Sequence, residues 1–557
     1  MNKKIPFVIG ITGHRDFEKD KYIDEYLDLL FNFLETTLKH TPVILLSPLA
    51  DGSDQYVAEK FLSYKKEKSL NWELIVPMPF KKECYLTTIE NKKNFNKLLQ
   101  EAKEKYVIKG GENPDMKNKS YKDFQYKKVG EFIANNSNIL IALYDGIKLN
   151  KEGGTSKIVE FKREGFKDCV FDNLDGNLLY WIQVERKNKT NSSKKENPII
   201  SDNDIEYLKK SLKLNDLDFS KLGIEVLGYK IDTLYSYAQI LKELDEINKD
   251  IEKFDNLKST SIRKFYSKVA SVNQKKFRHW NVSLILIGVL IVLGIELYHN
   301  FESKLGLLLY SVFITLGFLI YPFVNKKDYG KKWYAFRSLS EFLRVQEFWF
   351  EGKIEDPAFK DVAKVSKYIL PQNFTKWIWL KIAMNGIYIC KYKEYLYKKE
   401  NLEALKKEWV EKQFEYFSKK LNVLNKLDKL NILKKSVFLI GIIASVMTLI
   451  LSIFEIRHTE IEYLNTEHLL HLSFFVSSVS FLAVVVIEEK FLNNIFLKED
   501  EEKSYGLMYK IYGEALKKIK NNQNRKKIYF CLGKQALYEI SKWLEKRSDK
   551  KIELPIE

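Results

Sequence analysis

Two long apolar segments near the middle of the chain constrain its fold more than any other feature. Asn281–Tyr298 contains one acid, Glu296, and Leu305–Val324 contains no formally charged residue. As helices rising about 1.5 Å per residue, these segments are roughly 27–30 Å long, enough to cross the hydrocarbon core of a membrane. The short stretch between them allows only a tight antiparallel return. We therefore predict a transmembrane hairpin, with a buried helical hairpin in a large soluble domain as the alternative.

A second pair of apolar segments follows at Ser436–Ile453 and Leu469–Ile487. The pattern thus predicts four transmembrane helices, at about 281–298, 305–324, 436–453 and 469–487. Basic residues flank the ends that we place in the cytoplasm, whereas the loop within each pair holds few cations. These flanking residues are Arg263, Lys264, Lys268, Lys275, Lys276, Arg278, Lys326, Lys327, Lys331, Lys332, Lys434 and Lys435.

This charge distribution predicts a multi-pass protein of the inner (plasma) membrane with both termini in the cytoplasm. Met1–Pro6 leads directly into a strand-like run, so we expect no secretory signal. A chain of 557 residues is expected to hold two or more domains.

The net charge of +18 would suggest nucleic acid as a partner for a soluble protein. Here the lysines flank apolar spans, where they attract anionic headgroups, and no single arginine-rich face gathers them. We therefore expect a lipid membrane and no nucleic acid as a partner. The four cysteines form no CxxC pair and the seven histidines form no ligand pattern with them, so no metal site is predicted.

The N-terminal region alternates short apolar runs with helical patterns. Strands are expected at five places and helices between them, which is typical of a parallel sheet covered on both faces. The expected strands are Ile5–Ile11, Val43–Leu46, Trp72–Val76, Asn138–Leu143 and Leu178–Val184; the expected helices include Ile23–Leu38, Gln55–Tyr64, Asn91–Glu104, Tyr121–Asn135, Lys157–Glu164 and Asp232–Phe254. The fold class is therefore a Rossmann-like α/β domain followed by an α-helical membrane domain.

Glycine, serine and aspartate gather where three of these strands end, which is where ligands bind in parallel sheets. Glycines allow close approach of the backbone, and amides at helix starts suit phosphate groups. Taken singly, such residues are ordinary turns and caps, and no Walker A or GxGxxG motif is present. Their convergence favours a nucleotide-type ligand, held by Gly13, His14, Arg15, Asp51, Gly52, Ser53, Asp54, Gly153, Gly154, Thr155 and Ser156. No catalytic residue and no cofactor are predicted.

Three segments, GITGHRD, SPLADGSDQYVAE and YDGIKLNKEGGTSKIVEFKREG, resemble the SLOG superfamily of Rossmann-like domains related to the Smf/DprA and LOG proteins. The resemblance covers roughly residues 1–185 and implies a sensor of nucleotide ligands in bacterial conflict systems. Enzymatic LOG proteins carry PGGxGTxxE, whereas here the first acid after Thr155 is Glu160. Binding is therefore the better expectation than hydrolysis.

We expect the sensor domain to cover 1–255 and the membrane domain 256–557, with a long helix continuing from Lys264 into the first span. The segment YGKKWYAFRSLSEFLRVQEFWFEGK resembles the SLATT family of membrane effector modules associated with SLOG domains. Arg337, Glu341 and Arg344 lie at helical spacing there, either as surface ion pairs or between helices. In the fourth span Ser473, Ser477 and Ser480 share one face, which suits either a pore lining or helix packing.

The combined resemblance implies a membrane effector of an antiviral defence system. A nucleotide second messenger would bind the sensor and cause the membrane region to oligomerise as a homo-oligomer and open a pore. Two alternatives from other classes are a membrane-anchored nucleotide hydrolase and a membrane scaffold with a vestigial ligand fold.

Overall fold

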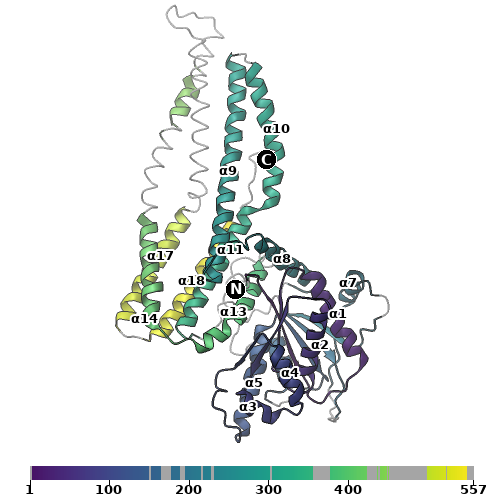
Figure 1. Cartoon of the computed structure of the whole chain (residues 1–557). Helices are drawn as coiled ribbons and strands as arrows, with labels where there is room; N and C mark the ends of the chain where they lie inside the picture. The colour runs from purple at the N-terminus through teal and green to yellow at the C-terminus, as the bar shows by residue number, and fades with distance from the viewer. Residues whose placement is uncertain are drawn as a thin grey trace, which may run out of the picture. The chain divides into compact units, whose positions relative to one another are not determined.

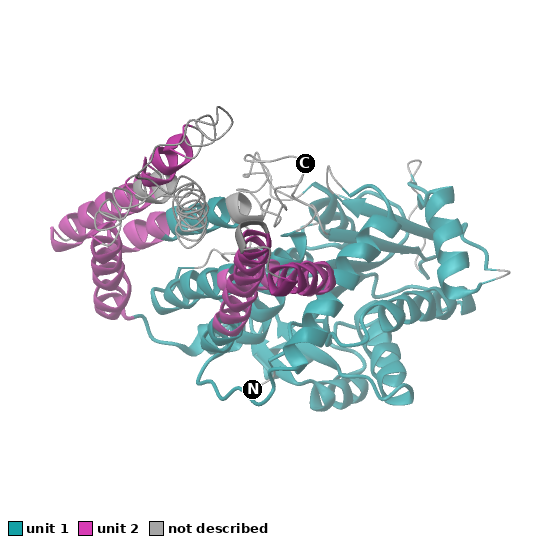
Figure 2. Ribbon diagram, turned by 90° about the horizontal axis from the view of Figure 1, so that it is seen from above, with its two compact units in different colours: residues 1–269, 338–400, 533–547 teal, residues 270–337, 401–532, 548–557 magenta. Residues whose placement is uncertain are grey.

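The computed structural model describes most of the chain. The described residues are 3–149, 152–164, 177–187, 195–214, 217–227, 231–301, 304–354, 377–422, 436, 439–447, 450, 498–521 and 524–548. They form two compact units (Figure 2). Unit 1 comprises 1–269, 338–400 and 533–547, and unit 2 comprises 270–337, 401–532 and 548–557.

Unit 1 is built on a seven-stranded sheet in the order β4-β3-β2-β1-β5-β6-β7 (Figure 1). The first six strands run parallel, and β7 pairs antiparallel with β6. The strands are β1 (Phe7–Gly13), β2 (Val43–Leu46), β3 (Trp72–Met78), β4 (Glu104–Val107), β5 (Ile139–Tyr144), β6 (Asn177–Gln183) and β7 (Leu222–Leu227). This confirms the expected α/β sheet and all five predicted strands, and adds β4 and β7.

The two unpredicted strands lie at the two edges of the sheet. In β4 only Tyr106 is buried, so the segment lacks the apolar run that marks a central strand. It also shortens the predicted helix 91–104, because α4 (Lys92–Glu101) ends there and Ala102 is extended. By contrast, β2 and β5 are buried at every residue, as expected for strands covered on both faces.

Helices cover both faces because right-handed crossovers in opposite directions place their helices on opposite faces. The chain moves from β1 to β4 in one direction, with α1 (Lys21–Thr37), α2 (Ser53–Glu67) and α4 on that face. It then crosses back beyond β1, which places α5 (Lys119–Asn136) and α6 (Thr155–Glu164) on the other face. The direction in which successive strands are added therefore reverses between β1 and β5.

The amino-terminal end of β1 is held by helices from later in the chain. The Asn248 side chain, on α8 (Leu234–Glu252), bonds to both the N–H and the carbonyl of Ile5 at 2.7 and 2.9 Å. On α13 (Ile378–Tyr397), a Cβ at Gly386 would lie 2.1 Å from the Pro6 carbonyl oxygen, so only glycine permits this approach. Unit 1 also contains the short helices α3 (Lys82–Tyr85) and α7 (Asp202–Leu212), and the Ser201 side chain caps α7.

Two helical segments, Ile262–Tyr298 and Lys304–Glu351, are long and apolar enough to cross a membrane. They contain α9 (Ile262–Phe301), α10 (Lys304–Lys327) and α11 (Tyr329–Glu351). Only 11% and 6% of their most apolar windows are buried, which favours the membrane hairpin over the alternative of a hairpin buried in a soluble domain. The continuous helix expected from Lys264 into the first span is confirmed by α9.

The helices α9 and α10 form the predicted antiparallel hairpin, and two glycines set their spacing. A Cβ at Gly294 would lie 2.6 Å from the Tyr310 amide nitrogen, and a Cβ at Gly306 would lie 2.5 Å from that of Tyr298. Backbone therefore packs directly on backbone near the tip, as is common where small residues meet between membrane helices.

The described residues contain two candidate membrane helices, where the sequence predicted four. Of the predicted third span, residues 439–447 are helical. The fourth span, 469–487, with Ser473, Ser477 and Ser480, lies outside the described residues. Unit 2 also contains α14 (Leu402–Leu405), the π-helical turn η3 (Lys406–Glu411), α17 (Lys498–Lys520) and the start of α18 (Arg525–Ser548).

Candidate functional site

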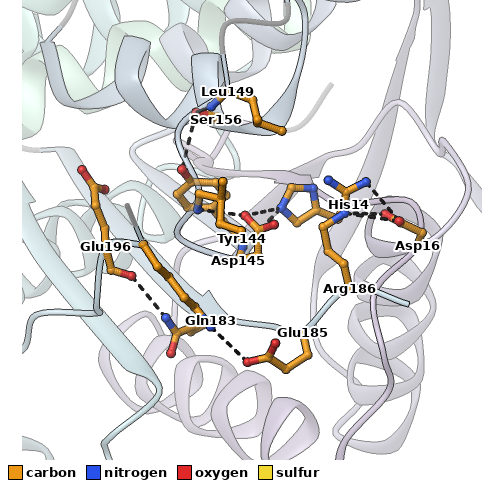
Figure 3. Close-up of polar contacts among 12 residues, drawn as sticks. His14, Asp16, Tyr144, Asp145, Leu149, Ser156, Gln183, Glu185, Arg186 and Glu196 are labelled. Atoms are coloured by element: carbon orange, nitrogen blue, oxygen red, sulfur yellow. Dashed lines mark hydrogen bonds and ion pairs between the residues drawn. The ribbon is translucent and has the colours of Figure 1, made fainter. Parts of the chain in front are cut away.

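The carboxyl ends of β1 and β5 form the point at which the strand order reverses. In open parallel sheets, ligands bind outside this point. Gly13 of β1 pairs with Leu143 of β5, and the pairing continues with a hydrogen bond from the His14 N–H to the Leu143 carbonyl at 3.1 Å. His14 and Asp145 therefore lie side by side just after the two strands end. Figure 3 shows His14 lying between Asp145 and the Asp16–Arg186 pair.

The imidazole of His14 contacts Asp145 through one nitrogen. Its Nε2 lies 3.0 Å from Asp145 Oδ1 and 3.2 Å from the Asp145 amide nitrogen. Burial alone would raise the pKa of Asp145, but the contacts with His14 and the Ile147 amide outweigh burial and hold the pKa below its ordinary value. The second carboxylate oxygen, Oδ2, is buried and has no hydrogen-bond partner among the described residues.

An ion pair closes the other side of this position. Arg186 donates from Nε and Nη2 to the Asp16 carboxylate at 3.0 Å each, in a fork geometry. Backbone bonds between 16–18 and 185–187 hold the two loops together. Burial opposes ionisation of Asp16, but the contact with Arg186 prevails and lowers its pKa. The loop after β1 is thus fixed to the loop after β6.

Arg15 points toward a different set of neighbours from those of His14. Its guanidinium carbon lies 5.4 Å from the centre of the Tyr126 ring on α5. The Tyr126 ring in turn lies 5.5 Å from that of Phe80, which follows β3. Asp54, in the first turn of α2, is buried, and burial raises its pKa to about 7 although Arg15 lowers it. An exposed cation, an aromatic face and a carboxyl that titrates near neutrality therefore lie together.

The second predicted segment, 51–54, is largely occupied by contacts within the protein. Ser53 donates both its hydroxyl and its amide to the His14 carbonyl at 2.6 and 3.2 Å. The carboxylate of Asp51 accepts from the amides of Glu90 and Asn91, next to the start of α4. Asp51 and Ser53 therefore hold neighbouring loops together, and Gly52, not Ser53, is the N-cap of α2.

Gly52 shows why this segment needs a glycine. Its φ of +78° is a left-handed conformation, and a Cβ there would lie 2.2 Å from the Arg15 carbonyl oxygen. Any larger residue would displace the backbone that carries Arg15.

The third predicted segment, Gly153–Ser156, forms the start of α6 and lies against α5. Gly153 has a φ of +72°, and a Cβ there would lie 3.3 Å from the Tyr126 Cβ. The Gly154 carbonyl accepts the amides of Lys157 and Ile158, so Thr155 and Ser156 begin the first turn. The Ser156 hydroxyl accepts from the Leu149 amide at 3.2 Å and thereby secures the β5–α6 loop.

The structure thus brings the three predicted segments to one edge of the sheet. Gly13 touches Ser53, Arg15 touches Gly52, and Tyr126 lies between Arg15 and Gly153. Sequence reasoning missed four residues of this edge, which are Asp16, Tyr126, Asp145 and Arg186. Three of them follow directly after central strands, so the rule that selected His14 and Arg15 could have found them as well. Tyr126 is brought in by α5 and has no such signal.

Among the described residues, no group of three or more histidine, cysteine, aspartate or glutamate side chains is placed to hold a metal ion. No protein-family model and no curated protein matches the chain. Fold and edge together define a Rossmann-like α/β unit in a chain that also carries two helices able to span a membrane.

Proposed function

We propose that the chain is a membrane effector controlled by a nucleotide-derived ligand. The ligand binds at the carboxyl ends of β1 and β5, and binding causes the membrane helices to assemble as a homo-oligomer and permeabilise the membrane. The SLOG-like and SLATT-like motifs are the basis for placing this activity in antiviral defence.

The observation that carries the proposal is the position of β1 between the candidate ligand edge and the helix that leads to the membrane. The strand ends at Gly13–Arg15 on the ligand side. Four residues before the strand begins, the Lys3 carbonyl accepts the Tyr266 hydroxyl of α9 at 2.9 Å. The seven residues of β1, at about 3.3 Å each, span roughly 23 Å between these two regions.

The helix α9 begins in unit 1 and continues without a break through the apolar span 281–298. Its first turns are firmly held within unit 1, because Phe265, Tyr266 and Val269 are fully buried. The Arg263 carbonyl also accepts the Ser340 hydroxyl, and its guanidinium pairs with Glu347, both on α11. A displacement of β1 would therefore act on the start of α9 and, through Arg263, on α11.

The first test is a thermal-shift screen of the full chain in detergent. The panel contains linear and cyclic nucleotides, ADP-ribose and isomers of cyclic ADP-ribose. A ligand at a hundredfold over its Kd stabilises the folded state by about 2.7 kcal/mol. Arg15→Ala and Gly154→Val should abolish the shift, whereas Lys105→Ala, which removes an exposed cation from the edge strand β4, should not.

The second test separates binding from its effect on the membrane. Tyr266→Phe keeps the buried ring and removes only the hydroxyl that bonds to Lys3. We expect ligand binding to persist and ligand-triggered leakage from vesicles to weaken. Turnover of a panel nucleotide would instead support a hydrolase. If nothing binds, and if toxicity of the expressed chain survives Arg15→Ala, the chain is a scaffold.

A further inference from the structure

Cations gather at one level of the hairpin, just before the first apolar span begins and just after the second ends. Contacts between the two helices define this level: the Trp280 ring lies 6.0 Å from that of Phe323, and the Phe277 ring lies 5.9 Å from that of Trp333. A Cβ at Gly330 would lie 2.9 Å from the Phe277 ring. Residues 275–280 of α9 therefore lie beside 323–333 of α10 and α11.

These two stretches contain seven cations and one acid, Asp328. The cations, which we call the basic collar, are Lys275, Lys276, Arg278, Lys326, Lys327, Lys331 and Lys332. The first five are exposed. At the other end of the hairpin, the connection between the spans carries one acid and one lysine. The charge is therefore concentrated at one level of the hairpin.

Several of these cations have no acidic partner within the described part of the chain. Lys275, Arg278 and Lys326 form no ion pair with any described residue. Lys276 lies over the Tyr329 ring and Lys327 over the Phe323 ring, at 5.4 Å each. Contact with a ring orients an ammonium group and leaves its full charge available to an anion.

Exposed apolar side chains begin directly beyond the collar. Val282 and Leu286 on α9 are 54% and 55% exposed, and Phe318 and Leu319 on α10 are 72% and 68% exposed. The aromatic rings of Trp280 and Phe323 lie between the charged and apolar zones, which is the order of a membrane interface. A binding partner must therefore present anionic groups next to hydrocarbon.

We propose that the basic collar binds the phosphate groups of anionic phospholipids, with the acyl chains along the exposed apolar side chains of α9 and α10. A nucleic acid offers the phosphates but has no hydrocarbon to cover these side chains. This inference rests on the membrane placement in the proposed function and is independent of the sheet's ligand.

The test measures lipid binding by the full chain in neutral detergent. Phosphatidylglycerol or phosphatidylcholine is added, and the bound lipid is counted by native mass spectrometry. We expect a clear preference for phosphatidylglycerol that declines as salt is raised. The triple variant Lys275→Gln/Lys326→Gln/Lys327→Gln should weaken this preference by roughly a hundredfold at low salt.

The matched control is Lys510→Gln/Lys518→Gln/Lys520→Gln on α17, which removes the same charge from exposed positions in the same unit. It should keep the preference. Equal binding of the two lipids by the unmodified chain, or an equal loss in the control, would overturn the proposal. So would binding of a lipid-free RNA oligonucleotide that depends on the same three lysines. A lipid preference without any nucleotide binding would instead count against the proposed function alone.

Discussion

Replacing Asp54 with asparagine should remove the loss of stability that the protonated Asp54 carboxyl causes as the pH rises. Asp54 lies in the first turn of α2 and is 7% exposed. Burial raises its pKa from 3.8 to about 7, although Arg15 and the Ala50 amide favour the charged form. The folded protein therefore holds a proton on this carboxyl that the unfolded chain releases at lower pH.

The sign follows from proton linkage. The folded state binds more protons than the unfolded state between pH 3.8 and about 7, so stability falls as the pH rises through this interval. At about 1.36 kcal/mol per pKa unit, the loss approaches about 4 kcal/mol and is complete above the folded pKa. Asparagine cannot ionise, so Asp54→Asn should be less stable than or equal to the parent at pH 4 and clearly more stable at pH 8.

The assay is thermal unfolding of the full chain in detergent across this pH range. A change of 1 kcal/mol shifts the Tm of a unit of about 350 residues by about 1–2 °C, so the difference in Tm between variant and parent should grow by roughly 4–8 °C. Asp232→Asn, at an exposed position in the same unit, is the control and should leave the pH profile unchanged. A difference in Tm between Asp54→Asn and the parent that stays constant from pH 4 to pH 8 would refute the reasoning. In an Arg15→Ala background, the loss of stability with rising pH should extend to higher pH, because Arg15 lowers the pKa of Asp54.

Three further predictions concern the packing of unit 1. Gly52→Ala places a Cβ against the Arg15 backbone at a φ of +78° and should destabilise the protein by about 2 kcal/mol or more in thermal unfolding. Its control is Gly506→Ala, where a Cβ would meet nothing within 4 Å, and this change should be neutral or stabilising. Lys162→Met removes a buried ammonium that donates to two carbonyls at the end of α5, and should cost about 2–4 kcal/mol; an unchanged Tm would contradict this. Asn248→Ala should release the start of β1, seen as faster amide hydrogen exchange there but not at its carboxyl end.

Local patterns were sufficient for the central elements. Strands β1, β2, β3, β5 and β6 were predicted because buried parallel strands are continuous apolar runs. The hairpin of α9 and α10 was predicted because crossing a membrane requires about twenty apolar residues. The edge strand β4 has neither signal, since an edge strand with one buried residue resembles a loop.

The candidate site was also predictable only in part from the sequence. Sequence alone identified the three segments that reach the edge, because carboxyl ends of parallel strands must converge. It could not separate Arg15, which faces Tyr126 and Asp54, from Ser53 and Asp51, whose polar groups are used inside the protein. Which polar group is already paired depends on neighbours that are distant in the chain.

The sequence by itself determined the parallel sheet, the hairpin and the sheet edge that the three predicted segments reach, because each follows from a periodicity or length within one segment. Only the tertiary structure decided which helices hold the start of β1. The apolar helix α13 lies far from the sheet in sequence and packs against Pro6 through Gly386, and Tyr266 of α9 bonds to Lys3. Such contacts depend on shape complementarity between remote segments, which no local pattern records.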